Sequence, residues 1–112
     1  MVGSKGTIMI ECELTYDLLP NVDTKAYLEW AKKTNGLMAK QPGLVEFRAN
    51  RNVLASPQIR TVSTWKSLED WAKFNQGTWQ PIQTELRGFA ANMRVELWGP
   101  SPILTEPVRP AK

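Results

Sequence analysis

The sequence contains no histidine and a single cysteine, Cys12. Without an imidazole group, the chain has no histidine-centred catalytic triad, no histidine general base and no ordinary proximal ligand for haem iron. One thiol cannot form an internal disulfide, and Cys12 has no histidine to act as its base. Because Cys12 lies in a run of alternating apolar residues, we expect a packed core thiol.

Long apolar runs and phosphate-binding loops are missing as well. No stretch approaches the roughly 20 apolar residues that cross a bilayer, and residues 1–6 lack the apolar core of a signal peptide, so we expect a cytoplasmic protein without a membrane partner. Gly3, Gly6 and Gly36 do not form a glycine-rich phosphate loop. No close group of Cys, Asp and Glu residues has the spacing of metal ligands, so no metal site is predicted.

The charge of the chain is basic but dispersed. There are 14 Lys and Arg residues against 11 Asp and Glu residues, and the longest basic run is Lys32-Lys33. A nucleic-acid-binding surface needs a clustered basic stripe, so no nucleic-acid partner is expected. The length of 112 residues, with 42% hydrophobic and 22% charged residues, is typical of one ordinary globular domain.

Four segments alternate apolar and polar residues with the period of a strand that has one buried face. They cover residues 7–15, 44–52, 59–66 and 92–98. Three helices are expected between them: Asp23 caps the first, Ser67 caps the second with Asp70 placed for a capping box, and Thr78 restarts a third after Gly77. The expected inward positions are Tyr27, Trp30, Ala31, Leu37 and Met38, then Leu68, Trp71, Ala72 and Asn75, then Trp79, Ile82, Leu86 and Phe89.

This order of elements predicts an α+β fold of the ferredoxin-like βαββαβ type. Both helical regions would cover one face of a four-stranded antiparallel sheet. The domain would span residues 7–99, preceded by an N-terminal extension of residues 1–6. A proline-rich tail of residues 100–112 would follow, because its prolines cannot continue a helix or lie within a central strand.

The face of the sheet without helices is expected to carry charges of both signs. A second copy packed on this face would pair carboxylates with arginines and bury Val62 and Trp98, so we expect a homodimer; an ordinary solvated face is the alternative. The other residues assigned to this face are Glu11, Glu13, Glu46, Arg48, Arg60, Thr64, Arg94 and Glu96.

Several of these features occur together in one known family. They are the first strand, the helix with Trp30, the Gln41-Pro42-Gly43-Leu44 turn, and the segment Thr64-Trp65-Lys66-Ser67-Leu68-Glu69-Asp70-Trp71. Over about residues 7 to 99 the chain resembles the antibiotic biosynthesis monooxygenase family of dimeric α/β barrels. The resemblance implies a dimer and cofactor-free oxygenation, in which an electron-rich phenol or enol loses a proton and passes an electron directly to dioxygen. The haem-degrading branch of the family uses a first-strand asparagine and a histidine that this sequence lacks.

A site for cofactor-free oxygenation needs an apolar pocket with a few polar groups that stabilise an oxyanion. Trp65, Trp71 and Asn75 are predicted to form the catalytic part of this site. The substrate would be a small aromatic or enolisable metabolite, oxidised to a quinone-type product. Its walls would come from the aromatic residues Tyr27, Trp30, Phe74 and Trp79.

Two other functions stay open at this point. Aromatic residues on inward faces also suit an ordinary core, so the chain could be a non-catalytic dimeric barrel that binds a small hydrophobic ligand or serves a stress-related role. An isomerase or decarboxylase on the same scaffold would require a carboxylate in the pocket. Glu85 is the only helical candidate for that role, and we expect it to face outward.

Overall fold

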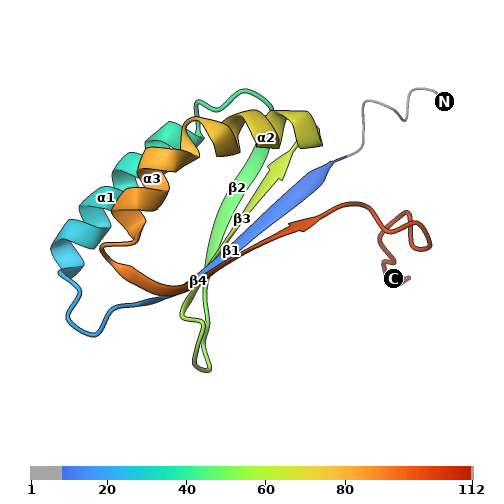
Figure 1. Cartoon of the computed structure of the whole chain (residues 1–112). Coiled ribbons are helices and arrows are strands. Elements are labelled where there is room, and N and C mark those ends of the chain that lie inside the picture. The colour runs from blue at the N-terminus through green and yellow to red at the C-terminus, as the bar shows by residue number, and fades with distance from the viewer. Residues whose placement is uncertain (1–8, 112) are drawn as a thin grey trace.

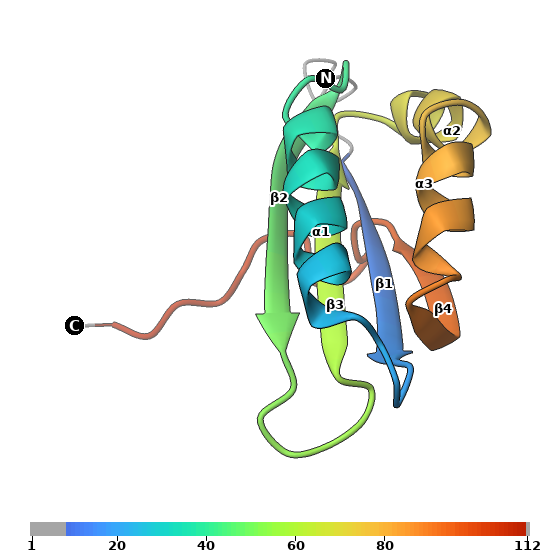
Figure 2. The ribbon, with the colours of Figure 1, turned by 90° about the vertical axis from the view of Figure 1, so that its left-hand side faces the viewer.

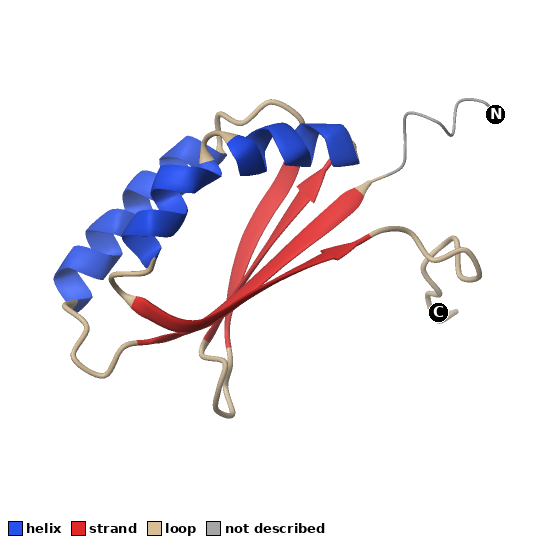
Figure 3. Cartoon of the chain, viewed as in Figure 1, coloured by secondary structure: helices blue, strands red, loops and turns tan. Residues whose placement is uncertain are grey.

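The computed structural model describes residues 9–111 and contains one antiparallel sheet covered by helices on one face (Figures 1 and 3). The strands lie in the order β2-β3-β1-β4. They are β1 (Ile10–Leu18), β2 (Leu44–Arg51), β3 (Ile59–Trp65) and β4 (Ala90–Trp98). The helices are α1 (Thr24–Met38), α2 (Leu68–Gln76) and α3 (Trp79–Leu86). The predicted ferredoxin-like α+β fold is therefore confirmed; Thr7, Ile8 and the extension of residues 1–6 lie outside the described residues.

The helix caps follow the prediction in two of three cases. Asp23 Oδ1 accepts a hydrogen bond from the Ala26 N–H at 3.1 Å, and Ser67 Oγ accepts one from the Asp70 N–H at 3.1 Å. The Asp70 carboxylate accepts the Ser67 hydroxyl at 3.0 Å, whereas in a capping box it would accept the backbone N–H of the cap residue. Thr78 makes no side-chain capping bond.

The Pro42-Gly43 turn joins the end of α1 to the start of β2 and lies against α2. Gly43 has a φ of 83°, and a Cβ atom on this residue would overlap the Asp70 side chain. The Gly43 carbonyl accepts the Lys66 N–H at 2.9 Å. Glycine is therefore required here both for the backbone conformation and for the close approach of α2.

Strands β1 and β4 extend further than the alternation predicts. Their added ends pair with each other, with Leu18 opposite Ala90, beyond a register shift between Thr15 and Asp17. Asn92, with a φ of 58°, lies in this irregular stretch. Because β1 continues past Thr15, the side chain of Tyr16 joins the face that the helices cover.

Two packed clusters occupy the covered face. The Leu86 cluster comprises Leu14, Tyr16, Leu86 and Ala90, and the Trp65 cluster comprises Met38, Trp65 and Phe74. Trp79 contacts both clusters. In Figure 2, α1 lies in front of β2 and β3 while α3 lies in front of β4, so the two helical regions stand side by side over the sheet.

Some inward positions differ from those predicted. Leu37 and Leu68 are 37% and 55% exposed, and Thr34, which was not among the predicted inward positions, is buried. Val45 is 46% exposed because β2 has a register shift between Leu44 and Glu46, which turns Leu44 toward the Trp65 cluster. A bulge adds one residue and reverses the alternation on one side of it, which explains the error at Val45.

The face of the sheet without helices carries both charge signs, as predicted, but Val62 is already buried within the single chain. Val62 is only 4% exposed and lies directly between Glu13 and Arg48 on the neighbouring strands, so it needs no second copy to bury it. Trp98 is 54% exposed. The ion pairs on this face are Arg60 with Glu13, Arg48 with Glu46, and Arg94 with Glu96.

The segment after β4 has no helix or strand through residue 111. It leaves β4 on the side of the sheet away from the helices (Figures 1 and 2). Within residues 9–111, none of the helices has the length and apolar character needed to cross a membrane. The cytoplasmic location stays a prediction.

Candidate functional site

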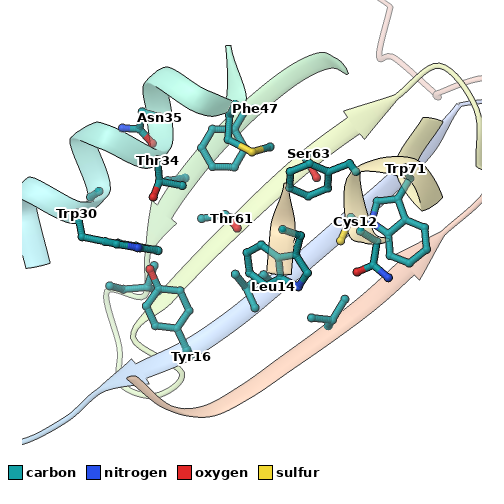
Figure 4. Close-up of a pocket in the computed structure, with 18 of the residues that line it drawn as sticks. Cys12, Leu14, Tyr16, Trp30, Thr34, Asn35, Phe47, Thr61, Ser63 and Trp71 are labelled. Carbon is teal, nitrogen blue, oxygen red and sulfur yellow. The ribbon is translucent and has the colours of Figure 1, made fainter. Parts of the chain in front are cut away.

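A cavity of about 160 Å³ lies between the sheet and the helices (Figure 4). Every strand and every helix described above contributes to its wall, which is mainly apolar and aromatic. It contains six of the seven residues predicted for the site, namely Tyr27, Trp30, Trp71, Phe74, Asn75 and Trp79. The structure thus brings together residues from three helices that the sequence assigned to one site.

Trp65 is the predicted site residue that does not line the cavity. Its side chain is completely buried, its ring lies 4.9 Å from that of Phe74 between centroids, and its Nε1 donates to Ser63 Oγ at 2.8 Å. Alternation along β3 placed Trp65 on the correct face, but it could not show that Phe74 and Ser63 lie between Trp65 and the open space. Trp65 therefore supports the cavity wall from behind.

A pair of tyrosines marks one end of the cavity. The hydroxyls of Tyr16, from β1, and Tyr27, from α1, lie 2.7 Å apart. Burial raises the pKa of Tyr16 strongly, and the hydrogen bond with Tyr27 raises it further. Burial also raises the pKa of Tyr27, while the hydrogen bond with Tyr16 opposes this change. Both phenols are consequently neutral at physiological pH.

Aromatic rings surround this tyrosine pair. Tyr27 stacks on Trp30 with 5.8 Å between ring centroids, and Phe89, just beyond the end of α3, lies 5.7 Å from Tyr27 and 6.1 Å from Trp30. Phe89 was predicted as an inward helical position; it keeps the inward contact although it follows the helix. These ring contacts, one stacked and two edge-on or tilted, hold the orientation of Trp30, whose indole lies against the cavity.

Cys12, Ser63 and Trp71 lie at the opposite end of the cavity (Figure 4), and Asn75 follows Trp71 by one turn of α2 in the cavity wall. Burial raises the pKa of the Cys12 thiol, and hydrogen bonds with Trp71 and Ser63 offset part of the rise. Cys12 was expected as a packed core thiol; it is instead half-buried and lines the cavity. Its raised pKa keeps it protonated at neutral pH, so it is a weak nucleophile there.

The cavity wall contains no Asp, Glu, Lys or Arg among the residues that the structure describes. Glu85 faces outward as expected, and its carboxylate pairs with Lys33 Nζ at 3.0 Å on the surface. The wall therefore offers no carboxylate base for an isomerase or decarboxylase. Within the same described range, no three Cys, Asp or Glu side chains gather closely enough to hold a metal ion.

Sequence reasoning missed five polar residues of the cavity wall, namely Tyr16, Thr34, Asn35, Thr61 and Ser63. Thr34 lies four residues after Trp30 and four before Met38, so the helical spacing could have found it despite its hydroxyl. Tyr16 continues the alternation of Cys12 and Leu14, but the predicted strand ended one residue too early. The omission of Tyr16 and Thr34 left the buried hydroxyls near Trp30 unpredicted.

No protein family model matches the sequence, and no curated protein is similar to it. Solved structures do match over most of the chain. SnoaB, a cofactor-independent oxygenase from Streptomyces nogalater, has a TM-score of 0.63 and 17% identity, covering 88% of this chain and 97% of that chain. A DABB-family protein with a ferredoxin-like fold from Mesorhizobium loti has a TM-score of 0.72 and 8% identity, covering 85% and 99%.

An Arabidopsis thaliana protein matches with a TM-score of 0.73 and 17% identity, covering 82% of this chain and 88% of that chain. At such low identities these similarities establish the fold and nothing more. The chain therefore shares its fold with a cofactor-independent oxygenase and a DABB-family protein, which confirms, at the level of the fold, the resemblance to the antibiotic biosynthesis monooxygenase family.

Proposed function

We propose that the protein is a cofactor-independent monooxygenase that oxidises a small aromatic or enolisable molecule to a quinone-type product. The observation that carries this proposal is the aromatic-walled cavity, in which the titratable wall groups of the described residues, Cys12, Tyr16 and Tyr27, are neutral at physiological pH. Apolar walls with a few placed polar groups are typical of sites for aromatic ligands. The fold shared with the oxygenase SnoaB adds support.

The proposed reaction requires only the substrate and dioxygen. The substrate loses a proton, and the resulting enolate or phenolate passes one electron to dioxygen. The two radicals then combine to form a carbon–oxygen bond, and loss of water from the hydroperoxide leaves a carbonyl. A methylene group and O₂ thus yield C=O and H₂O, so that carbon is oxidised and both oxygen atoms are accounted for.

The uncharged wall limits the substrates that such a site could use. Since no carboxylate, imidazole or amine from the described chain lines the cavity, the proton must leave an already acidic substrate and reach water. The protein would contribute orientation, exclusion of bulk water and hydrogen bonds to the developing oxyanion. Anthrones and hydroquinones, which ionise readily, fit this requirement.

The predicted site residues take distinct roles in this proposal. Asn75 and Trp71 would hold the reacting part of the substrate at the α2 end. Tyr27, Trp30, Phe74 and Trp79 would contact its rings. Trp65 would act as a positioning residue, because it reaches the cavity only through Phe74 and Ser63.

Oxygen consumption with a panel of anthrones and hydroquinones tests the proposal. Asn75→Ala is expected to lower the rate at least about tenfold, since a lost oxyanion contact costs about two to three orders of magnitude in well-studied enzymes. The variant Ala31→Leu fills the cavity, so it is expected to exclude the substrate and to lower the rate by a similar factor. Gln76→Ala, on the exposed position next to Asn75, is the matched control. Equal rates in all four proteins would remove the site assignment.

A non-catalytic ligand-binding protein is the second candidate. The absence of an acid or base from the described cavity wall favours it, because a binding protein needs none. Saturable binding of the same compounds without oxygen consumption would support this function. A stress-related role would be one use of such binding.

We also propose that two copies associate through the face of the sheet without helices. The support comes from Trp98, which is 54% exposed there, and from the sheet face around it, which carries both charge signs. Sedimentation at micromolar concentration is expected to show a dimer, and Trp98→Glu to shift it toward monomer. Val53→Glu, at a position 84% exposed in the loop between β2 and β3, is the control. A strictly monomeric wild type contradicts the dimer.

A further inference from the structure

Two buried polar atoms on α1 have no hydrogen-bond partner among the described residues: Trp30 Nε1 and Thr34 Oγ1. Both residues line the cavity, and they lie one helical turn apart on the same side of α1. Thr34 as a whole is only 7% exposed. Buried polar groups are nearly always hydrogen-bonded in folded proteins, so a neighbouring pair without partners needs an explanation.

The usual local partner of a helical threonine is not used by Thr34. A threonine hydroxyl within a helix commonly donates to the carbonyl four residues earlier. Thr84 in α3 does so, with its Oγ1 3.1 Å from the Gln80 carbonyl oxygen. The Thr34 hydroxyl makes no such bond, and Figure 4 shows it directed from α1 toward the cavity.

The tyrosine pair packs around Trp30: Tyr16 lies beside Trp30 (Figure 4), and the Tyr27 ring stacks on the Trp30 ring at 5.8 Å. Tyr16 and Tyr27 share one hydrogen bond of 2.7 Å, which uses the proton of only one hydroxyl. The other hydroxyl proton is not needed for the pair. This end of the cavity therefore gathers up to three hydrogen-bond donors: an indole N–H, a threonine O–H and a phenolic O–H.

The chemistry of these donors defines the ligand atom that would satisfy them. An indole N–H can only donate, so the atom beside it must be an acceptor. No Lys or Arg of the described chain lines the cavity, so a carboxylate or phosphate would be buried there without a balancing charge. A carbonyl, phenol or enolate oxygen attached to an aromatic ring, which delocalises its charge, meets both conditions.

We propose that Trp30 Nε1, Thr34 Oγ1 and the hydroxyls of Tyr16 and Tyr27 form an oxygen site, which binds the ring-attached carbonyl or hydroxyl oxygen of an aromatic ligand. The inference rests on the proposed aromatic-binding function, but it does not depend on oxygenation. The ring system would extend from the oxygen site past Ala31 toward Trp71 and Phe74. The oxygen site would thus fix which end of the ligand faces α2.

The test compares 1-naphthol with 1-methylnaphthalene, which has a similar shape but no oxygen. Binding is followed by ¹H–¹⁵N NMR, in which the Trp30 indole resonance is assigned from its loss in Trp30→Phe. Wild type is expected to bind 1-naphthol about tenfold more tightly, the usual scale of one buried hydrogen bond. The Trp30 indole resonance should shift with 1-naphthol and much less with 1-methylnaphthalene.

Thr34→Val keeps the shape of the side chain and removes the hydroxyl. It is expected to weaken 1-naphthol binding several-fold to about tenfold and to leave the affinity for 1-methylnaphthalene unchanged. The melting temperature of the ligand-free protein should not fall, because the hydroxyl has no partner within the described fold. Thr84→Val is the matched control: it loses the bond to Gln80 and should leave both affinities unchanged.

Two results would overturn the oxygen site. One is equal affinity of wild type for the two compounds, and the other is a Thr34→Val protein that melts well below wild type while keeping its preference for 1-naphthol. Failure of the oxygenase proposal looks different. A protein that prefers 1-naphthol through Thr34 but consumes no oxygen keeps the oxygen site and loses catalysis, whereas a protein that consumes oxygen with anthrones but gives either of the two results above keeps catalysis and loses the oxygen site.

Discussion

The two packed clusters on the covered face of the sheet differ in how their polar atoms are satisfied. In the Trp65 cluster the indole nitrogen of Trp65 is paired with Ser63 at 2.8 Å. Beside the Leu86 cluster, Trp30 Nε1 and Thr34 Oγ1 have no partner among the described residues. Trp65 therefore lies in a closed core with its polar atom satisfied, whereas the α1 residues near the Leu86 cluster have donors left for a ligand.

The space between the clusters follows from side-chain size. The bulky residues Trp65, Phe74 and Leu86 fill the two clusters, while the cavity wall between the sheet and the helices includes the small side chains of Ala31, Ala49, Thr61 and Ser63. Protein interiors pack densely wherever side chains can meet, so short side chains between bulky ones leave a gap. The cavity is thus a consequence of which residues face one another across the sheet and the helices.

The largest expected effect is on stability, from emptying either cluster. Trp65→Ala should lower the free energy of unfolding by about 3–5 kcal/mol, and Leu86→Ala by about 2–5 kcal/mol, because both side chains are completely buried. Leu28→Ala, at a position 53% exposed on α1, is the control and should cost below about 1 kcal/mol. Urea unfolding measures all three.

If Trp65→Ala cost no more than Leu28→Ala, the Trp65 end would not be a closed core, and the contrast between the clusters would fail. A smaller loss of unfolding free energy for Trp65→Phe than for Trp65→Ala would support the contrast between the clusters. Phenylalanine keeps an aromatic ring beside Phe74 but loses the hydrogen bond to Ser63. The difference between those two variants separates ring packing from hydrogen bonding.

A smaller effect is expected from the tyrosine pair. Tyr16→Phe leaves the Tyr27 hydroxyl without its 2.7 Å partner and should lower the free energy of unfolding by about 1–2 kcal/mol. Tyr27→Phe should cost a similar amount, and the double variant less than the sum of the two. Simple additivity in urea unfolding would show that the two hydroxyls do not stabilise the fold through each other, and the tyrosine pair would then be a pair of independent donors.

Most of the fold could be predicted from the sequence, because strand alternation and helix caps are local signals. The alternation of Cys12 and Leu14 indicates a strand, and Ser67 with Asp70 indicates the start of a helix. Neither signal depends on the rest of the chain. Departures from regular alternation were not predictable in this way. Because of the register shift beside Leu44, Leu44 faces the helices where the alternation predicted Val45. A bulge depends on how two strands pair, so the sequence of one strand does not reveal it.

The candidate site was predicted less completely than the fold. Aromatic residues at helical spacing identified most of the cavity wall. The sequence could not show how far each side chain lies behind the wall: Trp65 and Trp71 belong to the same motif, but only Trp71 reaches the cavity. The polar side was missed because a threonine among lysines on α1 reads as a surface residue. Only the packing of α1 over the sheet shows that Thr34 is 7% exposed.

The smallest of the three expected effects concerns Asp17, which follows Tyr16 on β1 and lies outside both clusters. Its carboxylate accepts hydrogen bonds from Ser56 Oγ at 2.7 Å, the Gln58 N–H at 2.9 Å and Asn92 Nδ2 at 3.0 Å, and so ties the loop between β2 and β3 to the start of β4. The bond from Ser56, followed by that from Asn92, lowers the pKa of Asp17.

A carboxylate whose pKa is lower in the folded state than in the unfolded chain stabilises the fold above the unfolded value of about 3.9, and this contribution is lost as the pH falls through the lower folded value. The melting temperature of wild type should therefore exceed that of Asp17→Asn at pH 7, and the gap should close as the pH falls below about 4. Thermal unfolding followed by circular dichroism between pH 7 and pH 2.5 measures it. Ser56→Ala should narrow the gap, since Ser56 makes the largest contribution to the lowered pKa. If the gap stays constant over this range, the negative charge of Asp17 does not stabilise the loop, and the shape and hydrogen-bonding capacity of the side chain are sufficient. The charge of Asp17 would then contribute nothing to holding the end of β1 that carries Tyr16.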